Sequence, residues 1–205
     1  KSPLAMLLPR PFVRFLGREV ARRLVKDEAV KTAEPESLER AVEQVLLDDL
    51  EAEDLIDEEV REILKQYDEF MRRNNVTYHQ MFQRVKRKLL EERKIAPAAS
   101  REGDMKLSRE KIIELSHKIS GKLPRLAGLR VMGGWNDVRL KIAREVTDIL
   151  AMESKVDARA RQMILSQKRA IVEGGEEWRI LHRRYYEQEM SRLGVDLRMP
   201  ETPQA

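Results

Sequence analysis

The segment LEAEDLID at residues 50–57 recurs as LAMESKVD at residues 150–157. The match continues on both sides at an offset of 100, and falls to an offset of 95 toward the N-terminus, where Phe12 meets Leu107. Further matched pairs are Val42 with Ile142, Leu46 with Val146, and Ile63 with Met163. A long self-match of this kind predicts that one structural unit occurs twice along the chain.

The spacing of apolar residues is helical almost throughout, so we expect an all-α fold. We predict two tandem, similar units of about four helices each, with a first unit at 6–95, a linker at 96–104, a second unit at 105–194 and a disordered tail at 195–205. The two units would pack about a pseudo-two-fold axis, as single-copy relatives would pack in homodimers.

Several residue pairs have the form of helix ends. Thr77 and Gln80 form a capping box, Ser108 is a further N-cap, and Asn75 and Gly194 suit left-handed residues that end helices. Separate apolar stripes before and after residue 55 also predict a helix break there, with Asp57 as the N-cap of the following helix. The acid at position 53, repeated as Glu153, has no assigned role.

Composition excludes several classes of protein. Of the 205 residues, 37% are charged and 41% apolar, which is too apolar for a disordered chain. There is no cysteine, so disulfides and thiolate chemistry are excluded, which suits a cytoplasmic location. No apolar run has the length of a membrane span, so no membrane partner is expected. We expect Met6 to be the natural start.

Charge is spread unevenly. Residues 1–104 hold 20 basic and 22 acidic side chains, a net charge of −2, and the remainder of the chain, with 20 basic and 14 acidic, has a net charge of +6. An acidic stretch, residues 43–69, lies in the first half. We therefore expect attraction between the halves, with the helix faces otherwise solvated.

Three short motifs point to a family. The segments MKLSREKI at 105–112, NDVR at 136–139 and WRILHRRYY at 178–186 resemble the bacterial domain-of-unknown-function family 507. The first half, residues 10–95, looks like a diverged member of it, because YHQMF at 78–82 replaces WRILH. The resemblance implies a shared fold and a bacterial origin, and it brings no catalytic residues.

The candidate binding surface lies in the last of these motifs. Arginines beside aromatic rings can hold phosphates and stack bases. The candidate residues are Trp178, Arg179, His182, Arg183, Arg184 and Tyr186. The structural alternative is that the aromatic stripe is core and that the arginines face solvent or pair with the acids of residues 43–69. A second basic cluster at 84–88 has no flanking aromatic face, which favours simple solvation.

No constellation typical of an enzyme is present. The acidic run at 48–59 contains no glycine for a calcium-binding turn, and the histidines His79, His117 and His182 lack partners at metal-ligand spacing. We therefore expect no catalytic residue, no metal and no cofactor. The leading interpretation is a non-catalytic helical interaction module, an adaptor or assembly factor of the bacterial cytoplasm, with a protein partner and a candidate homo-oligomer. The alternative is a protein that binds RNA, DNA or the ribosome through residues 178–186.

Overall fold

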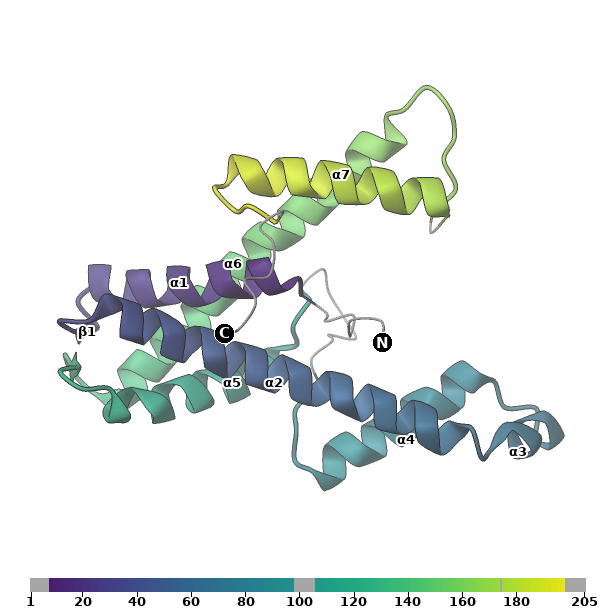
Figure 1. Ribbon diagram of the computed structural model, residues 1–205, viewed down its shortest axis with the longest axis horizontal. Coiled ribbons are helices and arrows are strands. Elements are labelled where there is room, and N and C mark those ends of the chain that lie inside the picture. The colour runs from purple at the N-terminus through teal and green to yellow at the C-terminus, as the bar shows by residue number, and fades with distance from the viewer. Residues whose placement is uncertain (1–7, 98–105, 174, 198–205) are drawn as a thin grey trace, which may run out of the picture.

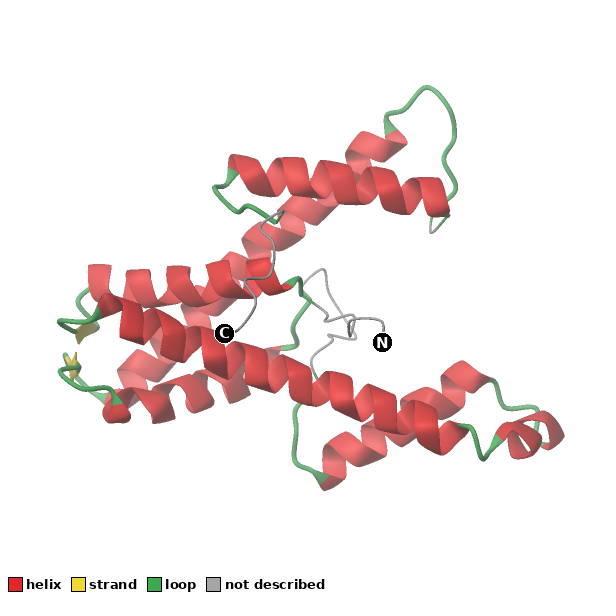
Figure 2. Cartoon of the chain, viewed as in Figure 1, coloured by secondary structure: helices red, strands yellow, loops and turns green. Residues whose placement is uncertain are grey.

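The computed structural model describes residues 8–97, 106–173 and 175–197. Helices dominate this part of the chain, as the apolar spacing predicts, and its only sheet is one two-stranded pair (Figure 2). In chain order the elements are α1 (Arg10–Lys26), β1 (Val30–Lys31), α2 (Pro35–Leu64), α3 (Asp68–Arg73), α4 (Tyr78–Glu92), α5 (Arg109–Lys122), a 3-10 turn (Leu123–Arg125), β2 (Arg130–Val131), α6 (Trp135–Leu165) and α7 (Glu176–Arg192).

Two arms extend from a common body (Figure 1). The body consists of α1, α5 and the N-terminal halves of α2 and α6. The first arm, residues 51–95, contains the rest of α2 with α3 and α4, and the second arm, residues 151–195, contains the rest of α6 with α7. At the opposite end of the body the strands β1 and β2 pair antiparallel, with Val30 opposite Val131. This pairing ties the corresponding loops of the two halves together.

The long helices α2 and α6 link the body to the arms. The ten buried residues of α2, from Leu38 to Leu64, recur 100 positions later as the ten buried residues of α6. Each buried stripe therefore continues from the body into an arm without interruption. The predicted break before Asp57 is wrong, because no glycine or proline lies between Leu50 and Asp57 to stop the helix. Asp57 is consequently a mid-helix residue and not an N-cap.

The predicted number of helices needs a related correction. The two apolar stripes on either side of residue 55 belong to one helix, and so do their counterparts in the second half. The first half reaches four α-helices only through the short α3, and the described part of the second half has three. The described part of the second half therefore has three α-helices and one 3-10 turn where about four helices are predicted.

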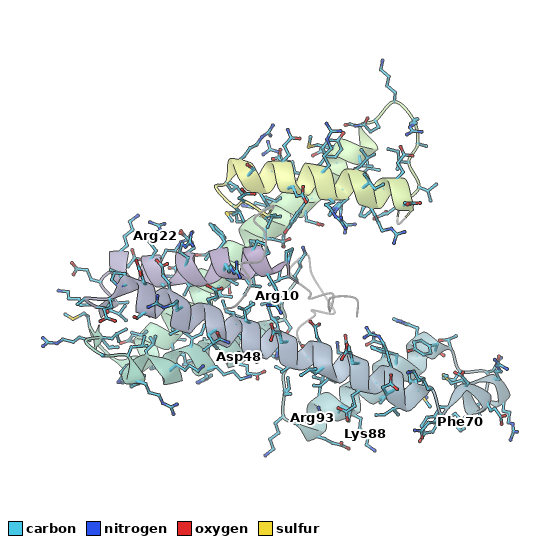
Figure 3. The ribbon with its side chains drawn as sticks, viewed as in Figure 1. Arg10, Arg22, Asp48, Phe70, Lys88 and Arg93 are labelled. Atoms are coloured by element: carbon cyan, nitrogen blue, oxygen red, sulfur yellow. The ribbon has the colours of Figure 1, made fainter. Side chains whose placement is uncertain are left out.

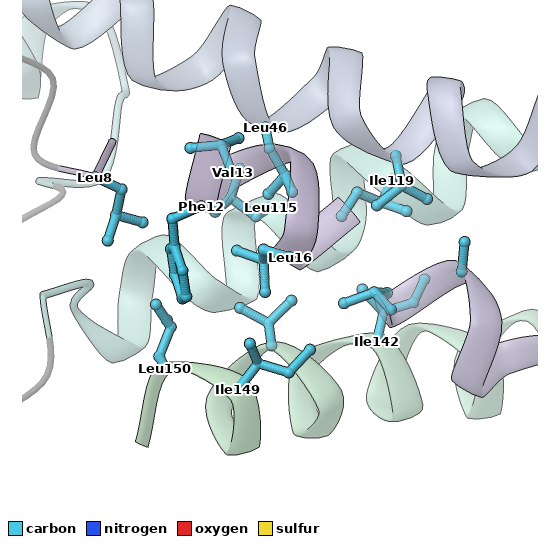
Figure 4. Close-up of a cluster of buried hydrophobic side chains, with 14 of the residues drawn as sticks. Leu8, Phe12, Val13, Leu16, Leu46, Leu115, Ile119, Ile142, Ile149 and Leu150 are labelled. Atoms are coloured by element: carbon cyan, nitrogen blue, oxygen red, sulfur yellow. The ribbon is translucent and has the colours of Figure 1, made fainter. Parts of the chain in front are cut away.

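One buried core fills the body. It includes Phe12 and Leu16 of α1, Leu46 of α2, Leu115 of α5 and Ile149 of α6 (Figure 4). The core is therefore shared between residues from both halves of the chain. The division into units at 96–104 stays a prediction, and most of that linker, like the expected start at Met6, lies outside the described residues.

The expected tail is ordered where the structure describes it. Val195, at the start of the segment predicted to be disordered, is buried, and Leu197 packs against the core. After the turn at Gly194 these two side chains thus lie at the core, and the bounds of the tail at 195–205 stay a prediction. The rest of the tail, residues 198–205, lies outside the described part of the chain.

Ion pairs also join the halves. Lys111 of α5 is fully buried and its Nζ lies 2.8 Å from Asp49 Oδ2 of α2. On the other side of the body, Arg23 of α1 donates to Glu145 of α6 at 2.8 Å. The first of these pairs matches the attraction expected between the acidic stretch of the first half and the basic surplus of the second.

Apart from the break at Asp57, the helix ends predicted at Thr77, Ser108, Asn75 and Gly194 are confirmed. Thr77 and Gln80 form the reciprocal capping box of α4. Ser108 accepts from the Lys111 backbone N–H at 3.0 Å and begins α5. Asn75, with φ of 54°, and Gly194, with φ of 79°, take the left-handed conformation after α3 and α7. The local sequence therefore predicts the helix ends at these positions correctly.

Gly17 of α1 lies directly against the backbone of α2 at Glu43. A Cβ added at Gly17 would lie 3.0 Å from the Cα and N of Glu43, which are backbone atoms that cannot move aside cheaply. We expect Gly17→Ala to lower the free energy of unfolding by about 1–3 kcal/mol through overpacking. The matched control is Gly121→Ala in α5, where nothing lies within 4 Å and where alanine should stabilise the helix by up to about 1 kcal/mol. Urea unfolding of both variants tests the pair, and equal effects would contradict it.

A second prediction concerns acid. The hydrogen bond and charge of Arg22, aided by Arg23 and opposed by partial burial, lower the pKa of Glu19 from 4.5 to about 2. A carboxylate with a lowered pKa stabilises the fold fully above its unfolded pKa and loses that contribution as pH falls toward its folded pKa. The free energy of unfolding should therefore fall less steeply between pH 4.5 and about 2 in Glu19→Gln than in the unmodified protein. Parallel pH profiles of urea unfolding for the two proteins would exclude this role.

Candidate functional site

The candidate residues lie on α7, the outer helix of the second arm. Gly175 precedes this helix, and Glu176 and Glu177 occupy its first turn, where carboxylates complement the positive end of the helix dipole. One face of α7 packs on the distal half of α6 through Tyr186 and Met190. The opposite face is turned to solvent. The six candidates divide between these two faces.

The aromatic candidates form an internal stack. The rings of Trp178 and His182 are 4.7 Å apart and nearly parallel, and those of His182 and Tyr186 are 5.9 Å apart. Spacing of four residues places all three rings in one row along the helix. The guanidinium of Arg161 lies 5.4 Å from the centre of the Trp178 ring, and His182 Nε2 lies 3.0 Å from Asp157 Oδ1. This row therefore faces α6, and only 19% of the His182 side chain is exposed.

A buried carboxylate lies beneath the stack. Glu153 of α6 is fully buried, and its Oε1 accepts a hydrogen bond of 2.7 Å from the Tyr186 hydroxyl. Lys106, just before α5, places its Nζ 2.5 Å from the same oxygen. Burial, and then the bond to Glu153, raise the pKa of Tyr186, so the phenol stays protonated and donates. Tyr186, a candidate binding residue in the sequence, is thus a structural residue of the arm.

The neighbouring acid is held by an arginine. Partial burial by itself would raise the pKa of Asp157, but the hydrogen bond of 2.8 Å from Arg161 and the charge of that arginine outweigh it, so the pKa is lowered. The carboxylate of Asp157 therefore stays ionised between Arg161 and His182. Both of its neighbours contact Trp178, which fixes the N-terminal part of α7 on the arm.

The first arm neutralises its buried glutamate, Glu53, with different residues. Lys86 occupies the position that corresponds to Tyr186, and its Nζ lies 3.0 Å from Glu53 and 2.7 Å from Asp57. Burial opposes the charge of Lys86, yet the bonds to Asp57 and Glu53 leave its pKa raised. The repeated acid at 53 and 153 is therefore a buried counter-charge in both arms. Sequence reasoning missed this role, although the repetition itself was the available signal.

The arginine candidates face the other way. Arg179, Arg183 and Arg184 are all exposed, and within the described residues none of them has a carboxylate within 4.0 Å. Ile180, between them in the sequence, is 63% exposed. Of the two options in the structural alternative, the arginines face solvent, and no pairing with residues 43–69 is found among the described residues. We call Arg179, Ile180, Arg183 and Arg184 the outer face of α7.

The residues around the outer face are less available. Arg159 of α6 lies 3.5 Å from the buried Glu189 and is already engaged. At the N-terminal end of α7, a shallow hollow of about 490 Å³ is lined by Glu176, Glu177, Ile180 and Leu181. Ile180 therefore borders both the arginines and this hollow. A partner that covers Ile180 would reach both.

The second basic cluster, for which simple solvation is predicted, divides between the inside and the surface of the first arm. Lys86 is turned into the first arm, whereas Arg87 and Lys88 lie at 4.0 and 3.9 Å from Glu91 and Glu92 on the exposed side of α4. Figure 3 shows Lys88 and Arg93 at the edge of this arm. Across the described ranges, no three His, Asp or Glu side chains are grouped so that they could hold a metal ion. Nor does any described helix combine the length and apolarity that a bilayer crossing requires.

The buried cluster of the second arm gives a stability prediction. Lys106→Met leaves the Glu153 carboxylate buried without its cation and should lower the free energy of unfolding by about 3–5 kcal/mol. Adding Glu153→Gln to this variant removes the uncompensated charge and should restore a large part of the loss. Lys155→Met, at an exposed lysine of the same arm, is the control and should change stability by less than about 0.5 kcal/mol. Lys106→Met with the stability of the control would refute this assignment.

The chain matches a known protein family. A search of curated proteins finds no significant match. The family model described as "Protein of unknown function (DUF507)" matches residues 6–195, and it covers both halves of the chain as a single domain. The match spans the body and both arms, including α7 and its candidate residues. The chain therefore belongs to the DUF507 family of proteins of unknown function.

Proposed function

We propose that the protein is a non-catalytic helical interaction module, an adaptor or assembly factor of the bacterial cytoplasm, which binds a protein partner through the outer face of α7. The observation that carries this proposal is the exposed trio of arginines, which have no carboxylate partner among the described residues, with the exposed Ile180 among them. Arginine and large apolar side chains are the residues that contribute most at protein interfaces. A partner would therefore gain both an apolar contact and charge-assisted hydrogen bonds.

The division of α7 into two faces supports this choice. Its inner face is occupied by the stack of Trp178, His182 and Tyr186 and by the bond to Glu153. Those groups hold the arm together, so its outer face can be changed without loss of the fold. A surface whose side chains do not hold the fold is free to bind a partner. Substitutions on the outer face can therefore test binding without unfolding the arm.

Nucleic-acid binding is the second candidate. It is favoured by the same unpaired arginines and by a sequence pI near 9.3. However, Trp178, His182 and Tyr186 are stacked on one another and turned toward α6, so their faces are not open to bases. Contact would rest on phosphates alone, which gives weak, sequence-independent and strongly salt-dependent binding. We rank it below a protein partner.

We also infer that the two halves arose from one repeated unit and pack about a pseudo-two-fold axis, with the first half diverged. The recurrence of the buried positions of α2 in α6 supports this, as does the pairing of β1 with β2 across the two halves. A chain built in this way has two arms that correspond in fold. Their surfaces are then free to differ.

The proposal predicts crosslinking at one position. A photo-crosslinking amino acid at position 180 should capture a discrete protein product in cells, because Ile180 is 63% exposed and lies among the arginines. Arg183→Glu with Arg184→Glu should reduce that product about tenfold or more, which corresponds to roughly 1.4 kcal/mol of binding. The same amino acid at Leu140, which is 51% exposed on the body, is the control. Equal products at both positions would contradict the proposal.

A second experiment separates the two candidate functions. Fluorescence anisotropy of labelled duplex DNA and structured RNA should show no binding by the purified protein near physiological salt, about 0.15 M. Binding that weakens steeply with salt, and whose salt slope falls by about one for each arginine replaced in Arg183→Ala and Arg184→Ala, would favour nucleic acid instead.

A further inference from the structure

The first arm carries a surface whose charge is opposite to that of the outer face of α7. Leu55 of α2 is 57% exposed. Glu58 and Glu59 follow it by three and four residues, and Glu62 follows by seven, so all of them share one side of the helix. Among the described residues Glu58 has no partner, because no hydrogen bond or ion pair reaches it. We call Leu55, Glu58, Glu59 and Glu62 the acidic stripe of α2.

The acidic stripe and the outer face have the same spacing. Leu55 is followed by carboxylates at positions i+3 and i+4, and Ile180 is followed by guanidiniums, Arg183 and Arg184, at the same positions. Each surface therefore presents one exposed aliphatic side chain with two like charges one helical turn away. Two helices that cross with their aliphatic side chains in contact would place the opposite charges together.

Neither surface is repeated on the other arm. The positions that correspond to the acidic stripe are Lys155, Ala158, Arg159 and Gln162, and those that correspond to the outer face are His79, Gln80, Gln83 and Arg84. The repeated fold thus keeps its buried positions and differs at these two solvent-exposed surfaces. Opposite changes on the two arms give one molecule both members of a complementary pair.

We propose that the protein self-associates head to tail, with the outer face of α7 in one molecule docked on the acidic stripe of α2 in a second copy. This inference rests on the proposed function, since it names the partner of the same surface. The contact joins two different surfaces, so each copy keeps one face free, and association continues into chains or closes into rings.

Other charges near the two surfaces confine the proposed contact to about one helical turn on each. Glu59 already lies 2.5 Å from Arg93, and Glu62 lies 2.5 Å from Lys65, but these pairs are exposed and weak enough to exchange. On α7, Glu176 and Glu187 lie one turn before and two turns after Ile180. A steep helix crossing, the common class near 50°, keeps such outlying acids apart. The association should accordingly be weak and salt-sensitive.

Sedimentation velocity over a range of concentrations tests the inference with the full chain. Arg183→Glu/Arg184→Glu removes the outer face, and Glu58→Arg/Glu62→Arg removes the acidic stripe. The matched control is Arg84→Glu/Arg87→Glu on α4, which changes the net charge by as much as the first variant. Circular dichroism confirms that each variant is folded.

The unmodified protein should show a weight-average mass that rises with concentration at low salt and falls as salt is added. Each face variant should weaken self-association at least about tenfold, equivalent to roughly 1.4 kcal/mol, whereas the control should not. An equimolar mixture of the two face variants should regain association, because the intact outer face of one variant meets the intact acidic stripe of the other, and the two reversed faces also carry opposite charges.

Three results would overturn the inference: a monomeric protein at every concentration in low salt, self-association that neither face variant weakens, or a mixture of variants that stays monomeric. The proposed function is judged separately. A crosslink from position 180 to a different protein would support the proposed function even if the chain is monomeric. The absence of any crosslinked protein would contradict both the proposed function and the self-association.

Discussion

The architecture depends on two helices that are longer than the body they help to form. Each of α2 and α6 carries one unbroken buried stripe that runs past the body. The core of the body ends at Leu50 on α2, whereas on α6 it continues into the second arm through Val156 and Ala160. Exposing the rest of each apolar stripe to water would cost free energy, so each half of the chain supplies a helix that covers it. In the first arm α4 covers Ile56, Val60 and Leu64, and in the second arm α7 covers Val156 and Ala160. The two-armed shape visible in Figure 1 follows from this requirement.

Buried charge determines how each covering helix is fixed. The arms are thin, and the first arm has a separate and small apolar cluster around Leu90. A buried glutamate at position 53 or 153 is costly unless it is neutralised, so it selects one arrangement of its neighbours. Lys86 of the covering helix neutralises it in the first arm, whereas in the second arm Lys106 supplies the cation and Tyr186 the hydrogen bond. The second arm is therefore also tied to the start of α5, and through it to the body.

Much of the fold could be predicted from the sequence because the relevant signals are local. Capping at Thr77 and Ser108 and the turn at Gly194 depend on a few adjacent residues, and helical spacing identifies the buried stripes. The predicted break before Asp57 is wrong because α2 only changes its packing partners there, from those of the body to those of the first arm, and does not end. In the candidate site, the sequence groups Tyr186 with the binding candidates, whereas the structure buries it against Glu153. The role of Glu153 was missed, since its partner Lys106 lies 47 residues away in sequence and belongs to another element. The unpaired state of Arg179, Arg183 and Arg184 likewise depends on three-dimensional distances that no local pattern contains.

The central claim is that the inner side of α7 is structural and its outer face binds a partner. Hydroxyl-radical footprinting in intact cells and on the dilute purified protein measures both sides in one experiment. In the purified protein Ile180 should react readily while the buried Tyr186 and Met190 stay protected. In cells, Ile180 should lose its reactivity, whereas Leu140, which is exposed on the body, should keep it. Equal reactivity of Ile180 in both samples, or reactive Tyr186 and Met190 in the purified protein, would contradict the account.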